Sequence, residues 1–148
     1  MANLVFNNKA TFDFEILEKF TAGIELLGFE VKSIRNHQGS LLGSYVTIRG
    51  GEAYLMNTNI PAFQPNNTPK DFDPLRNRRL LLTKKEISSL TSYEAKKGLT
   101  IVPISMYNSG RKIKVEIAVA RGKKKFDKRE TLKKRDAKRE MDRALKNQ

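Results

Sequence analysis

The chain has 148 residues, of which 39% are hydrophobic and none is cysteine. A chain of this length can bury one modest core, so we expect a single folded body. The lack of cysteine excludes disulfides, thiolate metal sites and cysteine nucleophiles. No run approaches the roughly 18 consecutive apolar residues of a membrane span, and the N-terminus lacks the pattern of a signal peptide. We therefore expect a cytoplasmic protein that does not enter a membrane.

The formal net charge of +13 and the pI of about 10.1 predict an anionic partner, because a polyanion offsets the self-repulsion of so many like charges. RNA, DNA or an anionic membrane would each fit. Residues 121–148 hold 13 Lys and Arg against 5 Asp and Glu. We therefore divide the chain into a body, residues 1–120, and a basic C-terminal tail, residues 121–148.

The first half of the chain contains three predicted strands and one predicted helix. Residues 11–16 alternate between polar and apolar side chains, as a half-buried strand requires. The spacing of Leu27, Val31 and Ile34 predicts a helix, although Gly28 weakens it by about 1 kcal/mol relative to alanine. Residues 44–48 and 52–57 flank two glycines and predict a β-hairpin.

A proline-rich segment separates these elements from the second half. Four of the five prolines lie between Pro61 and Pro74, which predicts a long irregular loop. Residues 80–82 predict a short buried strand. Thr83 and Glu86 form a capping box for a second helix, which Gly98 would end. Residues 99–105 and 112–119 predict two further strands, joined by a turn at residues 108–110.

Six short strands and two short helices favour a mainly β fold over a parallel α/β sheet. The expected architecture is an OB-like antiparallel β-barrel. In the tail, Asp127 and Glu130 resemble a helix start, and a thin apolar stripe follows at helical spacing. Because such a stripe buries little surface, we expect a tail that is mobile when free and helical when bound. We see no internal repeat.

Signatures of catalysis, cofactors and metals are missing. The sequence has no phosphate-binding P-loop, no dinucleotide-binding glycine motif and no histidine pair at metal-ligand spacing. His37 is alone and is interpreted as a surface or capping residue. Asp71 and Asp73 are interpreted as turn residues beside Pro74. An RNA-processing enzyme that uses either His37 or the pair Asp71 and Asp73 is the alternative to a binding protein.

Basic residues of the body form two groups that could contact phosphates. Arg76, Arg78, Arg79, Lys84 and Lys85 surround the start of the second helix, where arginine forks and exposed amides favour phosphate. The second group is Asn8 and Lys9 with Lys32 and Arg35. A solvated basic face remains the alternative in both cases. Three tyrosines could stack on bases, namely Tyr45, Tyr54 and Tyr107. Packing is, however, the more common role of an aromatic residue on a strand.

Two motifs extend these observations to a known family. Residues 28–35 read Gly-Phe-Glu-Val-Lys-Ser-Ile-Arg, and residues 122–130 read Gly-Lys-Lys-Lys-Phe-Asp-Lys-Arg-Glu. Shorter matching stretches lie in order between them, among them residues 52–57, 78–82 and 98–103. The chain resembles the SmpB family of SsrA-binding proteins over nearly its whole length.

The resemblance implies a non-enzymatic OB-like protein that binds the tRNA-like domain of transfer-messenger RNA as a monomer, without cofactor or metal. Together with elongation factor Tu it would deliver this RNA to stalled ribosomes for trans-translation. The body would stand where an anticodon arm stands, and the tail would enter the empty messenger channel at the decoding centre. The main rival is a general single-stranded-RNA-binding OB module with little selectivity and a strong salt dependence.

Position by position, the resemblance assigns one set of residues to the RNA face and another to the ribosome. The RNA-face residues are Asn8, Lys9, Lys32, Arg35, Asn57, Arg78, Arg79 and Lys84. The ribosome-binding residues of the tail are Gly122, Lys123, Lys124, Asp127, Lys128, Arg129, Lys133, Lys134 and Arg135. Two positions depart from the family pattern. Thr21 stands where relatives often carry glutamate, and Thr83 stands where they often carry asparagine or histidine.

Overall fold

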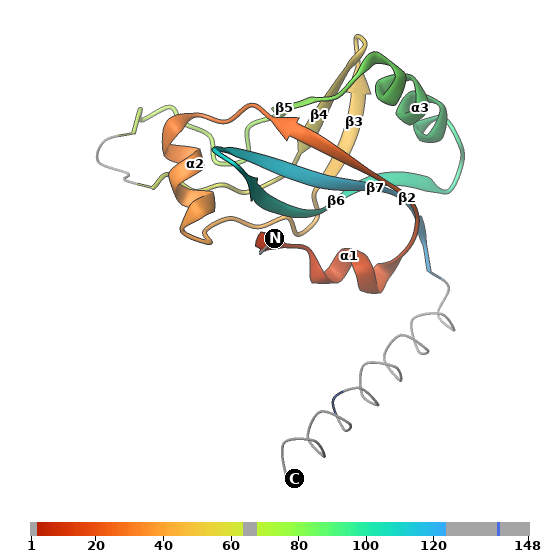
Figure 1. The fold of residues 1–148 in the computed structure, drawn as a ribbon, viewed down its shortest axis with the longest axis horizontal. Coiled ribbons are helices and arrows are strands. Elements are labelled where there is room, and N and C mark those ends of the chain that lie inside the picture. Colours follow the sequence, from red (N-terminus) through yellow and green to blue (C-terminus); the bar gives the residue numbers. More distant parts are fainter. Residues whose placement is uncertain (1–2, 64–67, 124–138, 140–148) are drawn as a thin grey trace.

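The computed structural model describes residues 3–63, 68–123 and 139, and within these ranges it contains seven strands and three short helices (Figure 1). In chain order these elements are β1 (Asn3–Phe6), α1 (Asn8–Asp13), β2 (Phe14–Ile24), α2 (Gly28–Arg35), β3 (Tyr45–Arg49), β4 (Glu52–Met56), β5 (Arg78–Leu81), α3 (Lys84–Glu94), β6 (Leu99–Ser109) and β7 (Lys112–Gly122). The prediction of a mainly β fold with short helices is confirmed. No helix of the described residues is both long and apolar enough to cross a membrane.

All seven strands belong to one antiparallel sheet in the order β1-β6-β7-β2-β5-β4-β3. The long strands β2, β6 and β7 form its centre. The sheet curls, and β3 comes to lie beside β6. Among the described residues the hydrogen-bonded ladder does not continue from β3 to β1, so in its pairing the sheet is open.

The predicted hairpin and the last two strands are confirmed. Tyr45 pairs with Met56 and Arg49 with Glu52, and the two turn glycines have φ of +58° and +75°, the left-handed region that a two-residue turn requires. Strands β6 and β7 are longer than predicted. Residues 108 and 109 belong to β6, and the turn between the strands contains Gly110, at φ +62°.

The prediction of a strand over residues 11–16 is wrong in its first half, because residues 8–13 form helix α1. The side chain of Asn7 accepts a hydrogen bond from the backbone N–H of Ala10 at 3.2 Å and caps this helix. Asn7 is itself buried, and its amide donates to the carbonyls of Leu41 and Pro103. These long-range bonds fix the helix where local alternation alone favoured a strand.

Helices α2 and α3 lie where the periodicity and the caps predicted them. At α3, the Thr83 hydroxyl accepts a hydrogen bond from the Glu86 N–H, and the Glu86 carboxylate accepts one from the Thr83 N–H. At α2, the N–H of Leu27 donates to the Glu30 carboxylate at 2.8 Å. Leu90 of α3 and Ile34 of α2 are fully buried, so each helix packs one apolar residue into the sheet.

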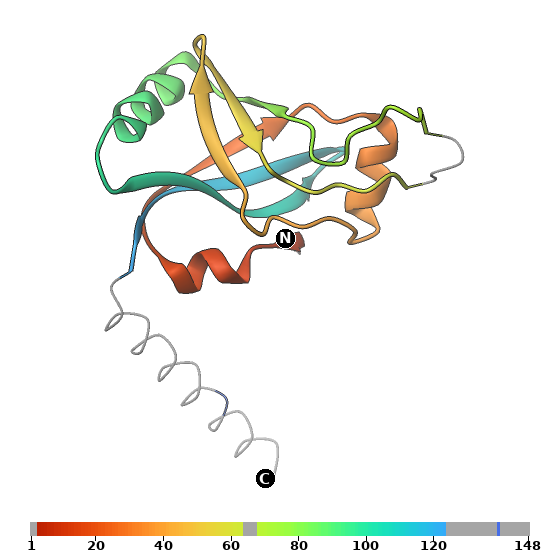
Figure 2. The same ribbon diagram turned by 180° about the vertical axis from the view of Figure 1, so that it is seen from behind.

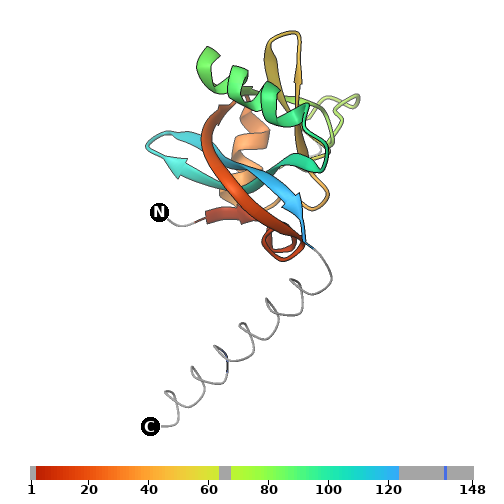
Figure 3. The same ribbon diagram turned by 90° about the vertical axis from the view of Figure 1, so that its right-hand side faces the viewer.

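Two apolar clusters hold the sheet and helices together. The larger one lies inside the curl of the sheet and includes Leu55, Ile101 and Ile117. The smaller one lies under α1, where Ala10 packs against Val102, Ile104, Ala118 and Ala120. Seen from the side, α1 and α3 lie at opposite ends of the molecule (Figure 3). The middle of β6 and the end of β7 are therefore buried on both faces.

Candidate nucleic-acid-binding surface

Asn8 and Lys9 open helix α1 and are both exposed. The buried Asn7 that precedes them anchors the helix start to the sheet. Lys9 lines a surface hollow of about 410 Å³ together with Gly43 and Tyr45. Asn57, which is exposed and has φ +64°, donates from its side-chain amide to the Gly43 carbonyl at 3.4 Å. The structure thus brings three of the predicted residues, Asn8, Lys9 and Asn57, to one side of the molecule.

Lys32 and Arg35 are exposed on α2 and form a second group with the turn between β6 and β7. The guanidinium of Arg35 donates to the carbonyl of Arg111 at 2.7 Å and to the side chain of Asn108 at 3.4 Å. The position of Arg35 is thereby fixed against this turn. Within the described part of the chain, no hydrogen bond or ion pair holds the Lys32 ammonium group, which therefore stays available to an anion.

Beside this group lies a hollow of about 310 Å³ with an apolar floor and a basic rim. Its floor includes Ile24, Val31 and Leu81, and its rim consists of Arg111, Lys112 and Lys114, none of which belongs to the predicted RNA-face residues. From the sequence, Lys112 and Lys114 are interpreted only as part of the strand predicted over residues 112–119. The signal that could have found all three is the density of cations around the turn at Gly110. Cations over apolar surface suit a polyanion that also presents sugar and base faces.

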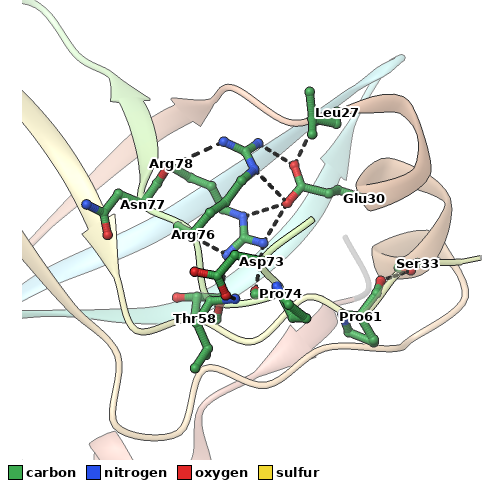
Figure 4. Close-up of polar contacts among 11 residues, drawn as sticks. Leu27, Glu30, Ser33, Thr58, Pro61, Asp73, Pro74, Arg76, Asn77 and Arg78 are labelled. Atoms are coloured by element: carbon green, nitrogen blue, oxygen red, sulfur yellow. Dashed lines mark hydrogen bonds and ion pairs between the residues drawn. The ribbon is translucent and has the colours of Figure 1, made fainter. Parts of the chain in front are cut away.

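Arg78 is the prediction that does not fit the structure, because its side chain is fully buried. Figure 4 shows its guanidinium in contact with the Glu30 carboxylate. It donates to the Glu30 carboxylate at 2.6 and 2.9 Å, and to the carbonyls of Thr58, Pro74 and Arg76. No atom of this guanidinium is left for a phosphate. We therefore correct its assignment from an RNA contact to a structural residue that joins β5, α2 and both ends of the long loop.

The Glu30 carboxylate at the centre of this network is also fully buried. Burial alone would raise its pKa, but hydrogen bonds from Arg76, from the Leu27 N–H and from Arg78 outweigh that cost, and the pKa lies below its ordinary value. Arg76 donates two hydrogen bonds to the same carboxylate. One buried anion thus holds two arginines that the sequence pattern groups as a phosphate-binding cluster.

The remaining members of that cluster are separated from one another. Arg79 is exposed, but its guanidinium is paired with Glu52 at 2.9 Å and with Glu25 at 3.1 Å, and the Glu52 hydrogen bond raises the pKa of Arg79. Lys84 and Lys85 are exposed in the first turn of α3. Of the predicted cluster, Lys84 and Lys85 therefore remain available to bind phosphate.

Two of the three side chains of the enzyme alternative, those of His37 and Asp73, make structural contacts. His37 has φ +60°, and its Nδ1 lies 3.0 Å from the Leu4 carbonyl. The Asp73 carboxylate accepts a hydrogen bond from the Leu75 N–H at 2.9 Å, the turn geometry expected before Pro74. Asp71 is exposed in the same loop. The described residues contain no group of three side chains that could hold a metal ion.

Two of the nine predicted ribosome-binding residues lie within the described part of the chain. Gly122 ends β7, and Lys123 is attached to α1, where its N–H donates to the Asp13 carbonyl at 2.9 Å and its ammonium group to the Thr11 carbonyl at 3.1 Å. The other predicted tail residues lie outside the described residues, namely Lys124, Asp127, Lys128, Arg129, Lys133, Lys134 and Arg135. The tail therefore departs from the body beside α1.

Comparison with known proteins decides the family. The model of the SmpB protein family matches residues 4–147. This chain belongs to the SmpB family. The resemblance carried by residues 28–35 and 122–130 is thereby confirmed, and the SmpB family is one of non-enzymatic RNA-binding proteins.

Individual relatives agree with the family match. An SsrA-binding protein from Clostridium acetobutylicum is 48% identical over 144 residues, which cover 97% of this chain and 92% of the relative. An SsrA-binding protein from Mesoplasma florum is 49% identical over 136 residues, which cover 92% and 91% of the two chains. A solved structure described as "tmRNA-SmpB: a journey to the center of the bacterial ribosome" contains a chain that is 39% identical, with a TM-score of 0.68 over 86% of this chain and 92% of that chain.

Within this SmpB-family chain, the two positions that depart from the expected family pattern lie beyond the same end of the pairing between β2 and β5. Strand β2 pairs with β5 so that Gly23 stands opposite Leu81 and Ile24 opposite Leu80. Continuing that register brings Thr21 towards Thr83, which caps α3. Leu81, which is 47% exposed, lies between this corner and the basic-rimmed hollow. Thr21 and Thr83 each lie two residues beyond the last pair of this ladder, Gly23 and Leu81.

Proposed function

We propose that this chain binds the tRNA-like domain of transfer-messenger RNA and delivers it to stalled ribosomes for trans-translation in the cytoplasm. The observation that carries the proposal is the match of the SmpB family to residues 4–147, joined to relatives of nearly equal length that are described as SsrA-binding proteins. The net charge of +13 is consistent with an RNA partner.

The part of the body that we assign to the RNA is the hollow between α2 and the turn after β6. Its rim residues Arg111, Lys112 and Lys114 and the neighbouring Lys32 and Arg35 supply cations around an apolar floor. A folded RNA offers closely spaced phosphates together with sugar edges, and this combination of charge and apolar surface suits such a target. Lys84 lies beyond Leu81 and would extend the contact to the start of α3.

Asn8, Lys9 and Asn57 lie on a different side of the body and are proposed as further RNA contacts. We infer that the body acts as an OB-like barrel in the place of an anticodon arm. The curl that carries β3 beside β6 supports a barrel, although the described pairing leaves it open.

The tail is proposed to enter the messenger channel and to fold there as a helix, acting as a unit of its own after the body. Its charge of 13 Lys and Arg against 5 Asp and Glu favours a channel lined by RNA. The attachment of Lys123 to α1 supports this division, because it fixes the point from which the tail starts. Delivery in a complex with elongation factor Tu, with the protein acting as a monomer, belongs to the same proposal.

Binding of the purified protein to an isolated tRNA-like domain and to an ordinary tRNA, over the same salt series, tests the proposal. Both affinities should fall with salt, by roughly 0.7 to 0.9 log units per contacted phosphate for each tenfold increase. The tRNA-like domain should keep its advantage at high salt, because contacts that depend on shape release few counterions. Equal binding of both RNAs at every salt concentration would support the general RNA-binding module instead.

A further inference from the structure

Helix α2 lies between the long loop and the hollow that we assign to RNA. It has eight residues, and its buried side chains are those of Glu30, Ser33 and Ile34. Isolated helices shorter than about 12 to 15 residues are marginal in water, so the position of α2 depends on its contacts with the rest of the protein. Two of the three buried side chains are polar. Hydrogen bonds must therefore supply a large share of this attachment.

These hydrogen bonds attach α2 to both arms of the long loop. Seen from behind, the two arms pass beside α2 (Figure 2). The hydroxyl of Ser33 donates to the Pro61 carbonyl at 2.5 Å, on the first arm. The Glu30 carboxylate accepts hydrogen bonds from Arg76 at 3.1 Å and from Arg78 at 2.9 Å, where the second arm leads into β5. The helix is thereby held at two points that lie one turn apart.

The opposite side of α2 carries cations. At 3.6 residues per turn, Lys32 stands roughly 200° and Arg35 roughly 140° around the helix axis from Glu30. Both cations are exposed. Arg35 donates to the Arg111 carbonyl at 2.7 Å, so α2 also contacts the turn that bears the rim of the hollow. A shift of α2 would therefore displace Lys32 and Arg35 relative to the rim cations.

Glu30 also holds the first turn of the helix. The Leu27 N–H donates to its carboxylate at 2.8 Å, and the helix opens on Gly28, a residue type with little preference for helix. Hydrogen bonds from Arg76, Leu27 and Arg78 keep the pKa of Glu30 below its ordinary value, so the carboxylate is ionised at neutral pH. One buried anion thus caps α2 and attaches it to β5. No other single side chain of α2 does both.

We propose that Glu30 is a positioning residue for RNA binding, which fixes α2 so that Lys32 and Arg35 face the RNA beside the hollow. The proposal rests on the proposed function, because it concerns the same RNA surface. Glu30 is fully buried and does not touch the RNA itself. By charge alone, loss of a carboxylate from this cationic protein would strengthen RNA binding. Loss of the position of α2 weakens it, so the two effects have opposite signs.

Titration of the full-length chain with the isolated tRNA-like domain, over a salt series, tests the proposal. Glu30→Gln should weaken binding, and the slope of log affinity against log salt concentration should become shallower by roughly 0.7 to 0.9 for each phosphate that α2 no longer contacts. Arg76→Gln keeps the buried pair of Glu30 and Arg78 and should weaken binding less. Arg76→Lys keeps a cation beside Glu30 and should bind like the unmodified chain. Urea unfolding establishes that each variant is folded in the binding buffer.

A double-mutant cycle separates positioning from a general loss of structure. Lys32→Ala should cost much less affinity in the Glu30→Gln chain than in the unmodified chain, because the lysine has already lost its position. Lys84→Ala, on α3, is the matched control and should cost the same in both chains. Where Glu30→Gln does not fold, the same cycle with Arg76→Gln decides.

Three results would overturn the positioning role. These are an affinity of Glu30→Gln equal to or above that of the unmodified chain, strictly additive costs of Glu30→Gln and Lys32→Ala, and an equal reduction in the costs of Lys32→Ala and Lys84→Ala. Failure of the proposed function gives a different result, in which the unmodified chain binds ordinary tRNA as tightly as the tRNA-like domain. The cycle then still decides the role of Glu30, because it needs only an RNA that α2 contacts.

Discussion

Replacing Glu30 by glutamine tests whether the buried carboxylate holds the core of the body together. The substitution keeps the size of the side chain but removes the acidic group that contacts both Arg76 and Arg78. Arg78 is fully buried and would remain as an uncompensated cation. Breaking a buried ion pair from one side costs about 3 to 5 kcal/mol. Because domains of this size are stable by only about 5 to 15 kcal/mol, Glu30→Gln should remove a large part of the total stability.

Urea unfolding at neutral pH, followed by circular dichroism, measures this effect as a decrease in the free energy of unfolding. Glu52→Gln is the matched control, because Glu52 is the exposed partner of Arg79. An exposed pair contributes about 0 to 1 kcal/mol, so this control should unfold almost as the unmodified chain does. Equal effects of Glu30→Gln and Glu52→Gln would show that the buried network contributes no more than a surface pair, and our reasoning would be wrong.

The same network predicts how stability depends on pH. The pKa of Glu30 is lower in the folded chain than its ordinary value, so the unfolded chain binds a proton at a higher pH than the folded one. The stabilisation is therefore fully present above the ordinary carboxyl pKa and disappears as the pH falls through the folded value. Glu30→Gln should flatten this acid limb of the stability profile. If the stability of Glu30→Gln falls at low pH as steeply as that of the unmodified chain, other carboxylates cause the acid sensitivity.

Three further predictions concern the RNA and the ribosome. The double variant Lys112→Ala, Lys114→Ala should weaken binding of the tRNA-like domain. The slope of log affinity against log salt concentration should become shallower by roughly 0.7 to 0.9 for each phosphate that the variant no longer neutralises. An unchanged slope would show that these lysines do not contact the RNA. Truncation after Lys123 should leave RNA affinity intact in a binding titration but abolish peptide tagging in a stalled-ribosome assay, whereas the disappearance of both activities would contradict a separable tail. Thr21→Glu and Thr83→Asn should change RNA affinity non-additively, with a coupling of about 0.5 to 3 kcal/mol in a double-mutant cycle, and strict additivity would place the two residues in separate contacts.

The elements that the sequence predicted well are those whose local signals agree with their packing. The capping box at Thr83 is fully formed, and the glycine pair at the β3–β4 turn adopts the positive φ values that its composition suggested. The strand predicted over residues 112–119 corresponds to β7, where Val115 and Ile117 point inward and are fully buried. In these places the residues that prefer a given secondary structure also make the contacts that stabilise it.

The elements that the sequence misassigned depend on contacts with distant residues. Helix α1 depends on Asn7, whose amide reaches the carbonyls of Leu41 and Pro103. Strand β1 has four residues, of which Val5 alone is buried, so it offers no alternation to detect. Its place in the sheet comes from pairing with β6, about a hundred positions along the chain. The long-range hydrogen bonds that fix α1 and β1 could not be predicted from the residues of these two elements alone.

The candidate site shows why charge alone is a poor guide to RNA contacts. A sequence count treats Arg76, Arg78 and Arg79 as one basic cluster, yet each has carboxylate partners in the structure. A guanidinium suits such pairs because its five donors can satisfy a carboxylate and several carbonyls at once, as Arg78 does. An ammonium group is more strongly hydrated and costs more to bury. The body's cations that remain free for phosphate are accordingly mostly lysines at helix starts and strand ends, and mutagenesis of RNA binding should begin with those.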